Sequence, residues 1–70
     1  MGLSTAQVRT LKAVRKANDH QRGIIPPNGP SSRPFKYLVT LGLLERRDAY
    51  HWLTESGRTT LEAIDAGKMS

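Results

Sequence analysis

The stretch LGLLERRDAYHWLTESG, residues 41–57, decides how this 70-residue chain is interpreted. Gly42 ends an apolar-periodic segment and is a natural left-handed helix stop, with Leu43 as its apolar contact. The segments LLERR and AYHWLT then alternate like two strands joined by a tight turn near Asp48. Thr54 is a good N-cap residue for a further helix. The stretch therefore predicts a helix end, a hairpin over about residues 43–53 and a new helix start.

Alternation along the two strands assigns their side chains to two faces. We expect Leu44, Trp52 and Tyr50 to point inward, and Leu53 to begin the next core contact. Trp52 is the only tryptophan, and we interpret it as a core anchor rather than a base-stacking surface. The histidines, His51 among them, are interpreted as polar surface residues because no spacing places two or three metal ligands on one face.

The segment SRPFKYLVTL, residues 32–41, predicts a helix with two distinct faces. Ser31 or Ser32 can cap it, and Pro34 fits its first turn. At 100° per residue the apolar and polar side chains separate into two groups. The apolar face consists of Phe35, Leu38, Val39 and Leu41, and the polar face of Arg33, Lys36, Tyr37 and Thr40.

Two further helices are expected, over about residues 4–18 and 55–66. Ser4 and Gln7 form a capping-box pattern at the start of the first helix, which NDHQRG ends. Its apolar side chains recur at helical spacing, whereas the last helix has a narrow apolar stripe of Leu61 and Ile64. The intervening GIIPPNGPSS is interpreted as a stiff loop with a short extended segment at its two isoleucines. The sequence leaves open whether residues 19–30 hold an extra helix.

Composition excludes several classes of protein. A chain of 70 residues is expected to form one domain, 1–70, with too small a core for a deep catalytic cavity. It has no cysteine, so disulfides and thiolate metal sites are excluded. No phosphate loop, carboxylate pair or signal peptide is visible, and no apolar run could span a membrane. We therefore expect no enzyme activity, cofactor, metal or membrane contact, and a cytoplasmic location.

The net charge of +5 is concentrated in one part of the chain. Residues 1–54 carry nine Lys/Arg against three Asp/Glu, whereas residues 55–70 carry two against three. Such a basic body favours a polyanionic partner such as nucleic acid over the alternative, in which the charge only keeps a small domain soluble.

The order helix, loop, helix, LGLLERR, short hairpin, LTESGR, helix resembles a winged helix-turn-helix domain over about residues 32–66. In that family a recognition helix ends in an LGL(L/V)ER pattern, a two-stranded wing follows, and LTxxGR opens the last helix. The resemblance implies an α+β, mostly helical fold with a three-helix core and a short wing. The chain departs from the family in the very short wing and in the few residues left for the second helix.

The resemblance also implies a DNA-binding surface. Helix 32–41 would enter the major groove, and the hairpin at 46–49 would touch the phosphate backbone or the minor groove. Arginine suits both roles, because it pairs bidentately with phosphate and with guanine edges. Since neighbouring strand residues point to opposite faces, Arg46 and Arg47 cannot both point the same way. The predicted DNA-binding residues are Arg33, Lys36, Tyr37, Thr40, Arg46 and Arg47.

Two classes of function follow. In the first, the chain binds double-stranded DNA as a small transcription regulator or architectural factor of phage or plasmid type, paired as a homodimer or assembled cooperatively. In the second, it is a protein-protein interaction adaptor on a winged-helix scaffold, with IIPPNGP as the docking loop. A single continuous basic patch across residues 33–40 and 46–47 would favour DNA, whereas charges scattered around the molecule, with an apolar patch near Ile24 and Ile25, would favour a protein partner.

Overall fold

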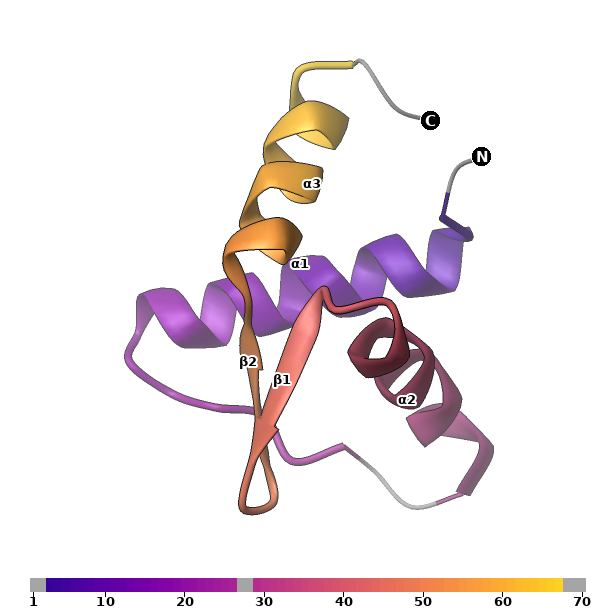
Figure 1. Ribbon diagram of the computed structural model, residues 1–70, viewed down its shortest axis with the longest axis vertical. Coiled ribbons are helices and arrows are strands. Elements are labelled where there is room, and N and C mark those ends of the chain that lie inside the picture. The colour runs from indigo at the N-terminus through magenta and orange to yellow at the C-terminus, as the bar shows by residue number, and fades with distance from the viewer. Residues whose placement is uncertain (1–2, 27–28, 68–70) are drawn as a thin grey trace.

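The computed structural model describes residues 3–26 and 29–67 of the chain. The fold is α+β and mostly helical, as the sequence predicted, with three α-helices around an antiparallel hairpin (Figure 1). Helix α1 crosses behind the hairpin, α2 lies beside it and α3 rises from its open end. In chain order the elements are α1 (Thr5–Asp19), the 3-10 helix η1 (Gly29–Ser32), α2 (Arg33–Thr40), β1 (Leu44–Arg47), β2 (Tyr50–Leu53) and α3 (Glu55–Asp65).

Helix α1 begins with the predicted capping box. The Ser4 hydroxyl accepts from the Gln7 amide at 3.2 Å, and the Gln7 side chain accepts from the Ser4 amide at 2.8 Å. The helix ends at Asp19, one residue later than predicted. Gln21 then takes a left-handed φ of 60°, a conformation that L-residues other than Asn and Asp seldom adopt. The hydrogen bonds at this turn are those of a Schellman ending, with Gln21 in the position that is usually a glycine.

The segment between α1 and α2 contains a strand-like contact and a single 3-10 turn. Ile24 forms an antiparallel bridge with His51, with N···O distances of 3.2 and 2.7 Å, which confirms the predicted extended segment. The turn η1 leads directly into α2, and the Ser32 hydroxyl donates to the Gly29 carbonyl at 2.8 Å. Ser32 occupies the N-cap position but its side chain makes no capping bond, because its backbone already has helical dihedral angles.

Helix α2 buries Phe35 and Leu38 and ends at the predicted glycine. Gly42 has φ 79°, and the Leu43 and Gly42 amides donate to the carbonyls of Leu38 and Val39 at 3.0 Å, a Schellman ending. One prediction for its apolar face is wrong. Leu41 is 46% exposed, because it lies beyond the last helical turn as the C-cap residue.

The hairpin pairs Leu44 with Leu53, Glu45 with Trp52, Arg46 with His51 and Arg47 with Tyr50. Directly opposite residues share a face, so one face carries Leu44, Arg46, His51 and Leu53 and the other carries Glu45, Arg47, Tyr50 and Trp52. The first face is directed at the core, since Leu44, His51 and Leu53 are buried. In the two-residue turn only Asp48 has a positive φ, 57°, the pattern of a type II′ turn.

This register corrects the predicted faces of β2. Tyr50 is 47% exposed and Trp52 only half-buried, on the outward face, so neither anchors the core. His51, expected at the surface, is 6% exposed and packs edge-on against Phe35 with ring centroids 5.4 Å apart. The predicted parity placed Leu44 and Trp52 on one face, whereas the structure pairs Leu44 with Leu53, and a shift of one residue exchanges the faces of a strand.

Hydrogen bonds of Thr54 join the start of α3 to the turn between α2 and β1. The Thr54 hydroxyl accepts from the Gly57 amide at 3.1 Å, the predicted cap, and donates to the Gly42 carbonyl at 2.6 Å. The Thr54 amide donates to Leu43 at 3.2 Å. A Cβ built at Gly57 would overlap the Leu43 carbonyl oxygen and lie 2.7 Å from Cδ2 of Leu53. Only glycine therefore fits where the first turn of α3 packs against the turn between α2 and β1.

Every regular element except η1 contributes to one apolar core. Burying each such aliphatic or aromatic side chain stabilises the fold by roughly 1.5–3 kcal/mol. Within the described residues, no helix combines the length and apolar character needed to cross a membrane. The core consists of Leu11, Val14, Phe35, Leu38, Leu44, Leu53 and Leu61.

Candidate nucleic-acid interface

The outward face of α2 carries the four side chains predicted to contact DNA. Because Phe35 and Leu38 are buried on the opposite side, the helix presents Arg33, Lys36, Tyr37 and Thr40 to solvent. Tyr37 leaves 49% of its surface exposed. The Thr40 hydroxyl donates its hydrogen to the Lys36 carbonyl at 3.1 Å. Its oxygen is therefore left as a hydrogen-bond acceptor on the exposed face.

Arg46 and Arg47 are both exposed but lie on opposite faces of the hairpin. Arg46 shares the inward face with His51, which contacts Phe35 of α2. Its Nε donates to the Asp48 carbonyl at 2.8 Å, and this bond orients the guanidinium beside the turn. Arg46 is therefore the hairpin arginine directed toward α2.

Lys36 and Arg46 line one pocket, which we call the helix–hairpin pocket. It lies between α2, the inward face of the hairpin and the segment before η1, and its walls include Ile25, Pro26, Phe35 and His51. No carboxylate lines it, and within residues 3–26 and 29–67 neither cation forms an ion pair. Two positive side chains from separate elements thus border one pocket that has no carboxylate among its lining residues.

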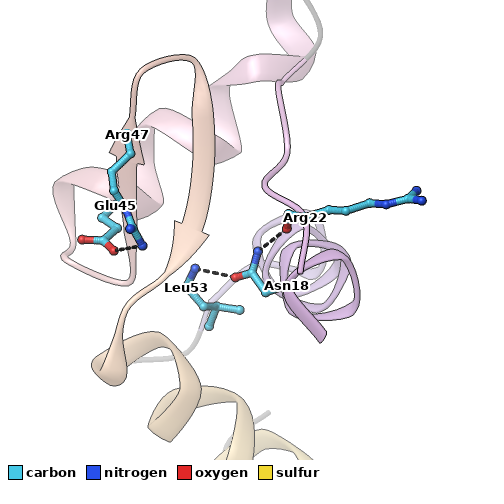
Figure 2. Close-up of polar contacts among 5 residues, drawn as sticks. All are labelled: Asn18, Arg22, Glu45, Arg47 and Leu53. Atoms are coloured by element: carbon cyan, nitrogen blue, oxygen red, sulfur yellow. Dashed lines mark hydrogen bonds and ion pairs between the residues drawn. The ribbon is translucent and has the colours of Figure 1, made fainter. Parts of the chain in front are cut away.

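Arg47 is held away from this pocket. Its Nη2 donates to Glu45 at 3.0 Å (Figure 2). Its guanidinium lies 5.1 Å from the Trp52 ring centroid. Glu45 offsets its charge, and the ring contact is a cation–π interaction on the outward face. The structure thus brings Arg46 together with the α2 residues and leaves Arg47 on the other side of the hairpin.

A second set of basic side chains lies on α1. Arg9, Lys12 and Lys16 are exposed along this helix, as expected for its polar side. Arg15 instead donates to Asp65 of α3 at 2.6 Å, and this hydrogen bond holds the pKa of the Asp65 carboxyl below its usual value. The positive charge is therefore divided between α1 and the surface formed by α2 and the hairpin.

Among the residues that the structure describes, the ion pairs are Arg15–Asp65 and Arg47–Glu45, so Arg58 pairs with none of the nearby acidic residues Glu55, Glu62 and Asp48. Arg58 is exposed on α3.

Asn18 positions the hairpin, a role that the sequence did not reveal. Figure 2 shows its side chain between the end of α1 and β2. Its Oδ1 accepts from the Leu53 amide at 2.8 Å, and its Nδ2 donates to the Arg22 carbonyl at 2.7 Å. The sequence marked Asn18 only as a helix breaker, because its partner in β2 is 35 residues away and no local pattern points to it.

The surface proposed for a protein partner is smaller than the sequence suggested. Ile24 packs against the core and pairs with His51, so of the two isoleucines Ile25, 57% exposed, is the accessible one. The other large exposed apolar side chains lie elsewhere, on α2 and the hairpin.

Comparison with protein-family models, with curated proteins and with solved structures finds no match to this chain. Within the described residues, no three side chains of the metal-binding types are grouped as a metal site would need.

Proposed function

We propose that this chain is a DNA-binding protein of the winged-helix type, acting in the cytoplasm as a small regulator or architectural factor. The outward face of α2 enters the major groove, with Arg33 near its N-terminal end, where recognition helices meet bases. Arg46 contacts the phosphate backbone beside it.

One observation carries this proposal: Lys36 of α2 and Arg46 of the hairpin line the same pocket, without a carboxylate among its walls. Lys36 and Arg46 lie about 10 positions apart in the chain and on different elements, yet both present their positive charge to this pocket. A DNA backbone that passes the start of α2 would meet both, and phosphate contacts supply most of the non-specific affinity of such proteins.

The order of elements supports the same interpretation. A helix, a connecting segment with a strand-like bridge at Ile24, a helix, a hairpin and a final helix follow one another in the order on which the resemblance rests. The 3-10 turn η1 stands where the second helix of a full winged helix would lie. The chain would thus be a shortened form of that fold, in which α2 serves as recognition helix.

The test is fluorescence anisotropy of a labelled random-sequence duplex at about 50 and about 200 mM salt. If Lys36 and Arg46 each neutralise one phosphate, the slope of log K against log salt is about −1.8, so affinity falls roughly twelvefold over this range. Lys36→Gln and Arg46→Gln are each expected to make the slope shallower by about 0.9.

Matched controls separate a defined interface from general charge attraction. Lys16→Gln on α1 and Arg58→Gln on α3 remove the same charges from exposed positions outside the proposed surface. We expect both controls to keep the slope of the unmodified protein. If they lower it as much as Lys36→Gln and Arg46→Gln do, the assignment of α2 and the hairpin is wrong.

A protein-partner function is the alternative, and exposed Ile25 beside Pro26 is the observation that favours it. An NMR titration with the same duplex distinguishes the two. Shifts in residues 33–40 and around Arg46 that weaken as salt rises support DNA binding. A spectrum unchanged at low salt rejects DNA binding and leaves the adaptor function.

A further inference from the structure

The helix–hairpin pocket has the dimensions of a small-molecule site. Its volume is about 350 Å³, within the range of roughly 300–1,000 Å³ that such sites occupy. The DNA backbone runs along a surface, whereas this depression extends inward as far as His51, which is 6% exposed.

Several of the residues that line the pocket are apolar. Ile25 and Pro26 come from the segment before η1, Phe35 from α2 and Ala49 from the hairpin turn. Ile25 is the most exposed large apolar side chain of the described residues. A ligand body that covers it would remove apolar surface from water, which is favourable by roughly 25 cal/mol for each Å².

The polar groups of the pocket are suited to an anion. Lys36 and Arg46 supply two cations, and no carboxylate lines the pocket.

We propose that the helix–hairpin pocket binds a small organic anion, with an apolar body about one ring in size that ends in a carboxylate or a phosphate, and that this ligand competes with DNA. The acidic group pairs with Lys36 and Arg46, and the body packs against Ile25, Pro26 and Phe35. Only the competition rests on the proposed DNA-binding function, because both ligands require the same two cations.

Binding is measured without DNA, by NMR titration of the labelled full chain. The probes are sodium benzoate and phenyl phosphate, with inorganic phosphate and benzyl alcohol as controls that each lack one half of the ligand. We expect saturable shifts around Ile25, Lys36 and Arg46, with a Kd on the order of 1 mM for benzoate or phenyl phosphate. The better of these two probes identifies the acidic group.

The controls define the outcomes that overturn the proposal. Inorganic phosphate and benzyl alcohol are expected to bind at least about tenfold more weakly than the better probe. If neither benzoate nor phenyl phosphate gives saturable shifts, the proposed site is wrong. Equal binding of inorganic phosphate overturns the requirement for an apolar body, and equal binding of benzyl alcohol overturns the requirement for an anion.

Charge removal and competition complete the test. Lys36→Gln and Arg46→Gln are each expected to weaken the probe about tenfold, while Lys16→Gln and Arg58→Gln leave it unchanged. With a bound duplex, the probe at ten times its Kd should raise the apparent Kd for DNA about elevenfold. A duplex unaffected by saturating probe overturns the competition. If the duplex does not bind at all, the proposed DNA-binding function is wrong. The titrations without DNA still show whether the pocket binds the probes.

Discussion

Replacing Gly57 by alanine separates local helix preference from tertiary packing. Gly57 lies in the first turn of α3, where alanine is the better helix former by about 1 kcal/mol. Local preference alone therefore predicts a more stable protein. The structure predicts the opposite, because the added Cβ would overlap the Leu43 carbonyl oxygen and press on Leu53.

The expected loss of stability in Gly57→Ala can be estimated from the backbone shift that the added Cβ requires. The Leu43 carbonyl is backbone and accepts from the Thr54 amide at 3.2 Å, so relief of the overlap requires α3 to shift away from the turn between α2 and β1. Forcing extra volume into a packed site costs about 1–3 kcal/mol, and weakening a hydrogen bond costs about 0.5–1.5 kcal/mol. After the helix gain is subtracted, we expect Gly57→Ala to lower the free energy of unfolding by roughly 1–3 kcal/mol.

The assay is urea unfolding followed by the fluorescence of Trp52, the only tryptophan. Thermal unfolding should show a fall in Tm of roughly 4–8 °C for each kcal/mol lost. Ser56→Ala, at the exposed neighbouring position of the same turn, is the control and should change stability by less than about 0.5 kcal/mol. A Gly57→Ala protein as stable as the unmodified chain, or more stable, would refute the packing argument.

Three other changes test the remaining structural assignments. Asn18→Ala removes the acceptor of the Leu53 amide and should cost about 1–3 kcal/mol, with faster hydrogen exchange at Leu53; unchanged exchange would contradict the bond. Gln21→Gly relieves a left-handed φ and should raise the free energy of unfolding by roughly 0.5–1 kcal/mol in the same urea assay, whereas a loss would argue against that backbone conformation. The pKa of Asp65 is lowered in the folded state by the hydrogen bond from Arg15, so this pair adds stability above the usual carboxyl pKa and loses it as pH falls through the lower, folded-state value. In urea titrations at several pH values, Asp65→Asn should therefore be less stable than the unmodified chain at neutral pH, and the difference should vanish in strong acid; a difference independent of pH would disprove the assignment.

The candidate interface was predictable on α2 and only partly on the hairpin. A helix repeats every 3.6 residues, so the buried positions of Phe35 and Leu38 determine that Arg33, Lys36, Tyr37 and Thr40 face outward. In the hairpin the sequence predicted that two adjacent arginines must diverge, but it could not tell which one faces α2. That choice depends on the pairing register, and the register places Arg46 opposite His51.

The histidine and the tryptophan of β2 show why composition misled the core assignment. Large aromatic side chains are usually buried and histidine is often exposed, so Trp52 was placed inside and His51 outside. The structure reverses both, because Leu44 and Leu53 form the inward pair and the residues between them follow in strict alternation. The helix–hairpin pocket, with His51 in its wall, depends on this reversal.

By itself the sequence determined the elements whose causes are local. The capping box at Ser4, the glycine ending at Gly42 and the cap at Thr54 act within a few residues, and each lies where the sequence placed it. Tertiary structure alone decided which face of β2 is buried and how Lys36 meets Arg46 in one pocket. The physical reason is range: caps and helical periodicity act between near neighbours, whereas strand register and a pocket between elements depend on contacts that form only when distant segments pack together.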